Sequence, residues 1–367
     1  MLKQSLQAYR QTILDLPAEN FLRNLQIIEQ EGVATISLRL GFYLSASQID
    51  RVIAQLSDYL YAQNITQAFE FSVLCDVTTH KVQSGLKPIK GIKNIIAIAS
   101  GKGGVGKSTT TANLAISLQK MGAKVGILDA DLYGPSQPLI MGSYDNPKTN
   151  DKKKIEPLLR HGIKMISVGN LIDQNSAIIW RGPMVSGALM QLLNDTNWGE
   201  LDYLLIDLPP GTGDIQLTMT KKIPLTAAVT VTTPQDLSLI DAKRAIAMFN
   251  KLDIHVAGIV ENMSVHICQN CGTESAIFGV HGAESLASQF DLPFLGALPL
   301  DISIREDADK GQPTANKDNK IAGVYERIAL KLAANLAALP KAMMINMPSV
   351  KVEFSDNSKN NANSENK

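Results

Sequence analysis

The sequence predicts an α/β fold with a mostly parallel sheet covered by helices on both faces, preceded by a small α+β domain. Two observations lead to this prediction. In the larger, later part of the chain, short apolar runs alternate with segments of helical periodicity, as in parallel strands joined by helices. These runs cover residues 95–100, 124–129, 203–208, 227–233, 256–261 and 293–298. Near the start of the chain, two segments alternate between apolar and polar side chains, which is typical of half-buried strands.

Length and composition limit the class of protein. The chain has 367 residues and a formal net charge of zero, which fits one large domain and a small one. The balanced charge gives no reason to expect a nucleic-acid partner, and no run of about 18 apolar residues predicts a membrane span. Three cysteines in a chain of this size indicate a reducing compartment. We therefore expect a cytoplasmic protein that binds neither nucleic acid nor membranes.

The first predicted elements belong to the small domain. Apolar residues at helical spacing predict helices over residues 5–16 and 46–63. The alternating segments at residues 33–40 and 68–75 are predicted to be strands, which gives a βαβ-like pattern. Cys75 ends the second strand in apolar surroundings, and we interpret it as a core residue rather than a ligand.

Composition also predicts where the domains begin and end. The small α+β domain is expected at residues 1–80, and residues 81–93, with four lysines, glycine and proline, are expected to be a linker. The large domain then runs over residues 94–345. Residues 346–367 are predicted to be a disordered tail, because they are rich in Asn, Ser, Lys and Glu and poor in apolar residues.

A glycine-rich segment follows the first apolar run of the large domain. From Ser100 to Thr109 it fits the phosphate-loop pattern G-x-x-x-x-G-K-[ST]. Glycines let backbone N–H groups turn toward phosphate oxygens, and the helix that follows directs its positive end at the same phosphates. The large domain is therefore predicted to be a P-loop NTPase that binds a nucleoside triphosphate. The predicted nucleotide-binding residues of the loop are Gly101, Lys102, Gly103, Gly104, Val105, Gly106, Lys107, Ser108 and Thr109.

Polar side chains at the strand ends are expected to complete the nucleotide site. Lys107 is predicted to reach the β- and γ-phosphates, and the Ser108 hydroxyl to ligate Mg²⁺. Asp129 and Asp131 follow the second apolar run, and Asp207 ends the third in a Walker B arrangement. Carboxylates at these ends can hold Mg²⁺ or orient the attacking water. The alternative is that Asp129 or Asp131 only caps a turn, and that Asp207 is only a structural acid.

Two later strand ends are predicted to contact the base. Asn262 follows the fifth run, and an amide can pair with both the donor and the acceptor edge of adenine. Pro299 and Asp301 follow the last run. The alternative for these residues is an ordinary hydrogen bond within a loop.

A pair of cysteines, Cys268 and Cys271, lies just after the fifth run and is followed by glycine. This C-x-x-C spacing suits a metal-binding turn, but it supplies only two of the roughly four ligands that Zn²⁺ or a [4Fe–4S] cluster needs. His266 and His281 are candidates to complete a zinc site within one chain. Alternatively, two chains each donate the pair across a two-fold axis. A redox dithiol and an inert pair are the remaining alternatives.

Taken together, these motifs resemble one family. The chain is similar to the Mrp/ApbC group of iron–sulfur cluster carrier ATPases, within the MinD/ParA-like class that has a deviant Walker A motif. The resemblance covers nearly all of residues 90–340. The segments that carry it are residues 100–109, 127–136, 180–183, 207–214, 232–235 and 261–263 together with the cysteine pair.

The resemblance implies roles for several residues. In that class the second lysine of the loop, here Lys102, reaches across a homodimer to the partner's phosphates, and Asp131 is the hydrolytic residue. Asp129 and Asp207 support Mg²⁺. The cysteine pairs of two chains bridge a [4Fe–4S] cluster, which is passed on to recipient apoproteins.

Two other functions fit the sequence less well than that of a cluster carrier with slow ATPase activity. A positioning or partition-type scaffold ATPase usually needs an amphipathic, membrane-targeting C-terminus or a basic DNA-binding surface, and this chain shows neither pattern. A reductase like the nitrogenase iron protein has bridging cysteines that lie far apart in sequence. The C-x-x-C pair therefore favours the carrier.

Overall fold

The computed structural model describes most of the chain. The described ranges are residues 2–132, 134–151, 154–170, 182–268 and 270–342. The predicted tail at residues 346–367 lies outside them, as do Trp180 and Arg181 of one family segment. Within these ranges, no helix has both the length and the apolar character that crossing a membrane requires.

The main sheet has eight strands in the described part of the chain. They are β4 (Ile92–Ala99), β5 (Val125–Asp129), β6 (Leu158–Arg160), β7 (Ile163–Ser167), β8 (Leu201–Asp207), β9 (Ala227–Thr232), β10 (Val256–Glu261) and β13 (Phe294–Ala297). Their order is β13-β10-β9-β4-β8-β5-β7-β6, and all neighbours are parallel except β6 and β7. All six predicted apolar runs form strands. The short pair β6 and β7 was not predicted. The edge strand β6 is largely exposed and has no apolar run, whereas the mostly buried β7 carries a short apolar signal in Ile163, Met165 and Ile166.

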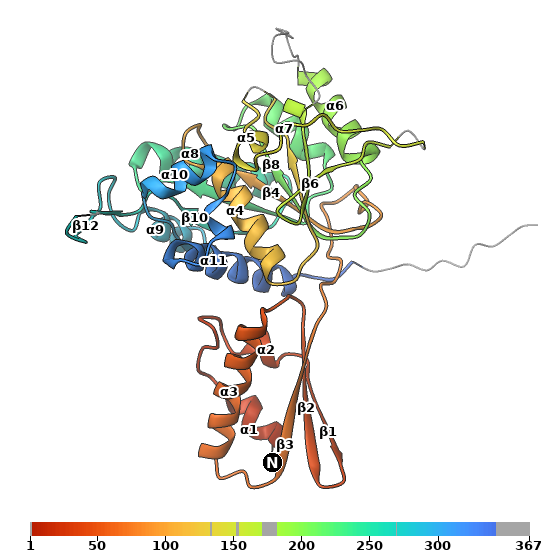
Figure 1. The fold of residues 1–367 in the computed structure, drawn as a ribbon, viewed down its shortest axis with the longest axis vertical. Coiled ribbons are helices and arrows are strands. Elements are labelled where there is room, and N and C mark those ends of the chain that lie inside the picture. Colours follow the sequence, from red (N-terminus) through yellow and green to blue (C-terminus); the bar gives the residue numbers. More distant parts are fainter. Residues whose placement is uncertain (1, 133, 152–153, 171–181, 269, 343–367) are drawn as a thin grey trace, which may run out of the picture.

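Helices cover both faces of this sheet (Figure 1). They are α4 (Lys107–Lys120), α5 (Gln137–Ile140), α6 (Gly182–Asp195), α7 (Asp214–Lys222), α8 (Asp236–Lys251), α9 (Gly282–Gln289), α10 (Ile302–Asp309) and α11 (Lys320–Ala337). Successive side chains of β4 point to opposite faces. Ile96 and Ile98 join the core under α4 and α11, whereas Ile95 and Ala97 join the core under α6 and α8. The predicted fold class is therefore confirmed.

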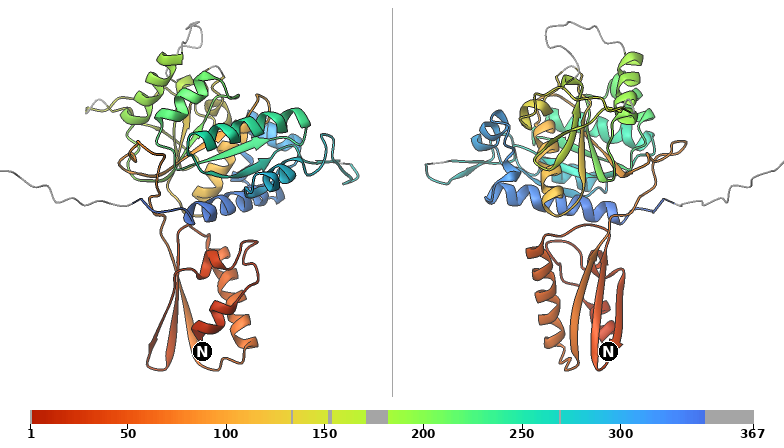
Figure 2. Two further views of the ribbon diagram at one scale, coloured as in Figure 1. Left: turned by 180° about the vertical axis from the view of Figure 1, so that it is seen from behind. Right: turned by 45° about the vertical axis from the view of Figure 1, so that its right-hand side comes forward.

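A second, smaller sheet lies below α11 at the N-terminal end of the molecule (Figures 1 and 2). Its strands are β1 (Leu25–Gln30), β2 (Val33–Leu40) and β3 (Ala68–Cys75), with β1 antiparallel and β3 parallel to the central β2. Helix α3 (Ala46–Ala62) connects β2 to β3, and the shorter α1 (Leu2–Ala8) and α2 (Glu19–Leu22) precede the sheet. The side chain of Ser45 and that of Gln48 form a reciprocal capping box at the start of α3.

The predicted helix over residues 5–16 is wrong beyond its first turn, since α1 ends at Ala8. The chain instead reverses at Leu14 and Asp15, which both have positive φ angles. Ile13 and Leu16 exchange backbone hydrogen bonds of 2.8 and 3.0 Å across this turn. The apolar side chains of the segment are buried by the turn rather than by one face of a helix.

Buried hydrogen bonds join the segment after β3 to the main sheet. The side-chain oxygen of Asn94 in β4 lies 2.9 Å from Nδ1 of His80, and its amide nitrogen donates to the Thr78 carbonyl at 2.9 Å. His80 and Asn94 are both only 1% exposed. Burial lowers the pKa of His80, which favours the neutral imidazole at this joint.

Replacing Asn94 tests this joint. We expect Asn94→Leu to lower the free energy of unfolding by about 2 kcal/mol, because it leaves buried groups of His80 and Thr78 without partners. Urea unfolding measures the change. Asn24→Leu, at an exposed asparagine, should change stability by less than about 0.5 kcal/mol. Equal effects of the two substitutions would contradict the assigned role of the joint.

Candidate functional site

The phosphate loop connects β4 to α4, as its sequence predicts. Gly104 and Gly106 have φ angles of +80° and +82°, in the left-handed region that glycine tolerates best. A Cβ on Gly106 would lie 2.1 Å from Nδ2 of Asn262, and one on Gly101 would lie 2.2 Å from the backbone of Asp241. The tight approach of neighbouring elements therefore explains both motif glycines.

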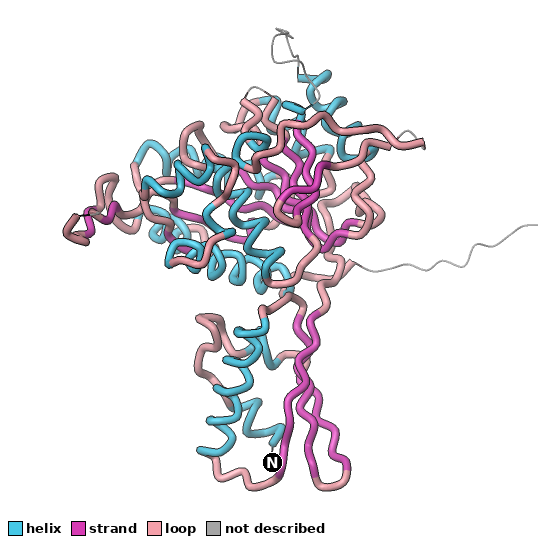
Figure 3. The backbone as a smooth tube through the Cα atoms, viewed as in Figure 1, coloured by secondary structure: helices cyan, strands magenta, loops and turns pink. Residues whose placement is uncertain are grey.

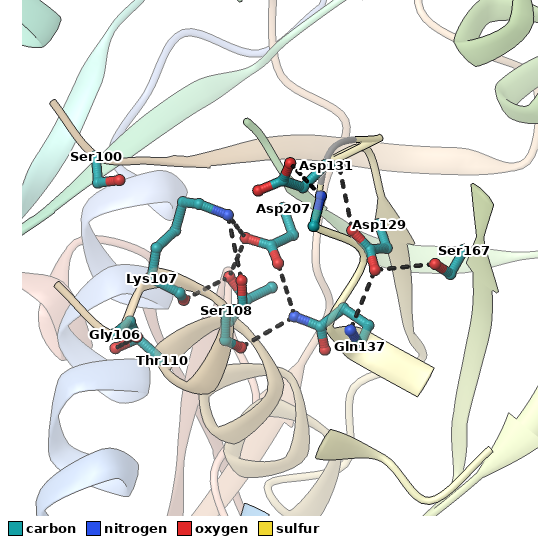
Figure 4. Close-up of polar contacts among 12 residues, drawn as sticks. Ser100, Gly106, Lys107, Ser108, Thr110, Asp129, Asp131, Gln137, Ser167 and Asp207 are labelled. Atoms are coloured by element: carbon teal, nitrogen blue, oxygen red, sulfur yellow. Dashed lines mark hydrogen bonds and ion pairs between the residues drawn. The ribbon is translucent and has the colours of Figure 1, made fainter. Parts of the chain in front are cut away.

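A buried ion pair lies at the start of α4. Lys107 is 6% exposed, and its ammonium group forms an ion pair with Asp207, which is fully buried at the end of β8 (Figure 4). Thr111 contacts the same carboxylate oxygen at 3.3 Å. The other oxygen accepts a hydrogen bond of 2.9 Å from the side-chain amide of Gln137. Charge and hydrogen bonds together satisfy the buried carboxylate.

A second buried carboxylate, Asp129, lies beside the first. Asp129 and Asp207 are direct partners in the register of β5 and β8. Asp129 accepts hydrogen bonds from the Ser167 hydroxyl at 2.9 Å and from the backbone N–H of Gln137 at 3.1 Å (Figure 4). Burial and the neighbouring charge of Asp207 raise the pKa of Asp129 to about 7. Two acids held this close in the interior create a site that favours a cation.

Asp131 lies at the rim of this site. Its backbone N–H donates to Asp129 at 3.2 Å, and its carboxylate accepts the N–H of Gly134 at 3.3 Å. The residue is 8% exposed. It also lines a cavity of about 1000 Å³ together with Pro209, Pro210, Gly213 and Asp214 of the loop after β8. Asp131 therefore faces the loop between β8 and α7 across this cavity.

Lys102 does not share the buried network of Lys107. Its ammonium group lies 3.5 Å from the side-chain oxygen of Gln235, which is the residue before α8. The side chain is partly exposed at the surface. The two lysines of the loop therefore point to different surroundings, one inside the site and one at its outer edge.

The predicted base-contacting residues have local partners. Asn262 donates its side-chain N–H to the carbonyl of Val105 at 2.9 Å, which ties the end of β10 to the phosphate loop. Asp301 accepts the N–H of Ser303 at 2.8 Å and thereby caps α10. Pro299 lines a groove of about 430 Å³ together with Phe294 and Ala297 of β13. Asn262 and Asp301 therefore make the hydrogen bonds within loops that were the alternative to a base contact. Their contact with a base stays a prediction.

Three residues that contact the buried acids were not predicted from the sequence. Gln137 bridges Asp129 and Asp207, Ser167 contacts Asp129, and Thr111 contacts Asp207. Thr111 lies one helical turn after Lys107, so its spacing was a usable signal. Gln137 and Ser167 carry no motif, because only the strand order places them next to the acids.

The cysteine pair lies in a small hairpin that extends away from the main sheet (Figure 3). Its strands are β11 (His266–Ile267) and β12 (Glu274–Ser275). The turn is closed by hydrogen bonds from Cys268 N–H to the Thr273 carbonyl at 3.0 Å and from Gly272 N–H to the Cys268 carbonyl at 2.8 Å. We call residues 264–268 and 270–281 the thiol hairpin.

Hydrogen bonds within the hairpin change the pKa of the Cys271 thiol. Contacts with Thr273 and with Cys268 lower the pKa of the Cys271 thiol, which favours the thiolate that binds metals. Partial burial instead raises the pKa of the Cys75 thiol, which packs against the core at the end of β3. Cys271, rather than Cys75, therefore has the thiol chemistry of a ligand.

The histidines near the hairpin have other partners. Nδ1 of His266 lies 3.3 Å from the Leu300 carbonyl, and Nδ1 of His281 lies 2.8 Å from the carboxylate of Glu284. Among the described residues, no three His, Cys, Asp or Glu side chains are grouped so that they can hold a metal ion. The geometry thus lends no support to a zinc site of two cysteines and two histidines within one chain.

Comparisons with known proteins agree with this geometry. Residues 91–333 match the family model of the NUBPL iron-transfer P-loop NTPase. A Haemophilus influenzae protein named iron-sulfur cluster carrier protein is 47% identical over 86% of this chain and 86% of its own length. The Escherichia coli protein of that name is 49% identical over 79% of each chain.

A solved structure is also similar. It is a nucleotide-binding protein from Archaeoglobus fulgidus in complex with ADP, 40% identical to this chain. The superposition has a TM-score of 0.55 and covers 62% of this chain and 90% of that one.

A substitution in the loop tests the nucleotide site. We expect Gly106→Ala to weaken ADP binding by more than about tenfold, because left-handed strain and the close approach of Asn262 act together. Titration with a fluorescent ADP analogue measures the affinity. Gly32→Ala in the small sheet domain is the matched control, since Gly32 has the same φ of +82° and its new Cβ would meet nothing within 4 Å. Unchanged affinity of the Gly106 variant would show that nucleotide does not bind at this loop.

Proposed function

Because the chain belongs to the NUBPL family of iron-transfer P-loop NTPases, we propose that it carries iron–sulfur clusters to recipient apoproteins, and that ATP binding and slow hydrolysis control its homodimer. One observation supports this proposal most directly. The phosphate loop follows β4 and the thiol hairpin follows β10, and both strands run parallel in one sheet. Nucleotide and thiol sites therefore lie at the same carboxyl edge.

The cargo is proposed to be a [4Fe–4S] cluster bound by Cys268 and Cys271. One chain supplies two thiols, and a cluster needs about four protein ligands. Two copies of the hairpin, related by a two-fold axis, supply the four. Cys271 is exposed, so a partner has direct access to this thiol. The low number of cysteines supports a reducing compartment such as the cytoplasm for this chemistry.

The acidic part of the nucleotide site fits Mg²⁺. Asp129 and Asp207 are buried neighbours, and the pKa of Asp129 is raised mainly by burial and further by repulsion from the charge of Asp207. A divalent cation relieves that repulsion, and Mg²⁺ prefers oxygen ligands. Ser108, Asp129 and Asp207 would hold the ion, which would neutralise charge on the phosphates when bound.

The remaining residues are proposed to position and stabilise the phosphates. Lys107 leaves Asp207 for the β- and γ-phosphates, and Asp131 orients the water that attacks the γ-phosphate. Lys102 lies at the outer edge, from which it can reach the phosphates of a partner chain. Asn262, with Pro299 and Asp301, is proposed to border the base.

Iron content tests the shared cluster. After anaerobic reconstitution we expect about four irons per dimer and a broad charge-transfer absorbance. Cys268→Ala and Cys271→Ala should each abolish both signals, whereas Cys75→Ala should keep them. Iron analysis together with the mass in solution decides the outcome. Zinc retained by monomers after the same treatment would rule out the bridging model.

Hydrolysis and cluster binding should be separable. We expect Lys107→Ala to reduce ATP hydrolysis by at least about a hundredfold, because the charge that stabilises the transferring phosphoryl group is removed. Iron loading should stay unchanged. Phosphate release and iron content measure the two properties, with the exposed Lys124→Ala as control. Loss of iron from a well-folded Lys107 variant would contradict the separation.

A further inference from the structure

The thiol hairpin is held at its root by a buried acid. Glu261 is the last residue of β10 and is 4% exposed. Its carboxylate accepts the backbone N–H of Ala283 at 2.8 Å. Ala283 lies in the first turn of α9, directly after the hairpin. The chain thus leaves the sheet at Glu261, forms the hairpin, and returns to a hydrogen bond with the same residue.

Helix α9 depends on this distant acid. The residue at its N-cap position, His281, has φ +55° and makes no side-chain cap to the helix. Helix N-termini carry unpaired N–H groups and a partial positive charge, and a carboxylate satisfies both. Glu261 therefore caps the N-terminus of α9, as a Ser or Asp directly before the helix does in other proteins.

The root of the hairpin also touches the nucleotide loop by two short routes. Asn262, the next residue after Glu261, donates to the carbonyl of Val105 in the loop at 2.9 Å. On the other side, the backbone of Gly282 is packed so closely on Pro234 that an added Cβ would lie 2.8 Å from its carbonyl oxygen. The residue after Pro234 is Gln235, the partner of Lys102.

We infer that Glu261 is a positioning residue that couples the state of the bound nucleotide to the geometry of Cys268 and Cys271. A change in the loop moves Asn262, and with it the end of β10. Because Glu261 holds both the departing strand and the returning helix, the hairpin reorients as one unit. The inference rests on the proposed function, since it regulates the same thiols, but its test needs no cluster.

Alkylation of the thiols measures this coupling. In full-length protein carrying Cys75→Ser, without iron, only the hairpin cysteines react with iodoacetamide. We expect their rate to differ by at least about fivefold between ADP and a non-hydrolysable ATP analogue, which is a typical allosteric coupling. Glu261→Ala should bring that ratio close to one, and Glu261→Gln, which keeps an acceptor oxygen for Ala283, should largely preserve it.

A matched control separates coupling from helix charge. Glu284 also lies in the first turn of α9, but its side chain is 53% exposed and contacts His281 rather than β10. Glu284→Ala should therefore leave the nucleotide effect intact. A ratio that survives Glu261→Ala, or a ratio of one before any substitution at Glu261, overturns the inference.

A second measurement uses the unmodified protein, so its result does not depend on whether a Glu261 variant folds. Hydrogen–deuterium exchange of the unmodified protein should show a nucleotide-dependent rate for the amide of Ala283. Identical exchange with ADP and the analogue also overturns the coupling. Iron loading of the same preparation is scored separately. Normal iron content with nucleotide-independent thiols defeats only this inference, whereas absent iron with nucleotide-dependent thiols defeats only the carrier proposal.

Discussion

The buried carboxylate of Asp207 is the interaction on which the nucleotide site depends. It is inaccessible to solvent and contacts Lys107 and Thr111 from α4 and Gln137 from α5. An unpaired charge in the interior would cost several kcal/mol, so this carboxylate needs a cation and hydrogen-bond donors beside it. Gln137 also donates its backbone N–H to Asp129. One acid pair and one amide thereby set the relative positions of β5, β8, α4 and α5.

The parallel sheet brings the second site to the same edge. Since β4 and β10 end at one side of the sheet, the phosphate loop and the thiol hairpin need no long connection. Two hydrogen bonds suffice to join them, one from Asn262 to Val105 and one from Ala283 to Glu261. This short connection between the two sites suits an NTPase whose relatives are named iron–sulfur cluster carriers. The nucleotide is then well placed to influence a cargo bound outside its own pocket.

Local pattern predicted the parts of the fold in which burial is continuous. Strands such as β8 and β9 are buried along their whole length, so their apolar runs are unmistakable. The edge strand β6 is largely exposed and left no such run. The expected helix over residues 5–16 failed for a different reason. Backbone reversal at Leu14 and Asp15 buries the same side chains without helical geometry, and hydrophobic spacing does not distinguish the two.

The sequence by itself determined the chemical groups of this protein: the loop glycines, the two lysines, the strand-end acids and the cysteine pair. These motifs are short, and their spacing has a mechanical meaning within a single strand–loop–helix unit. Only the tertiary structure decided which groups meet. The hydrogen bond between Gln137 and Asp207 joins residues 70 positions apart, and Glu261 meets Ala283 across the whole hairpin. Such contacts follow from the order of strands in the sheet, which no local pattern encodes.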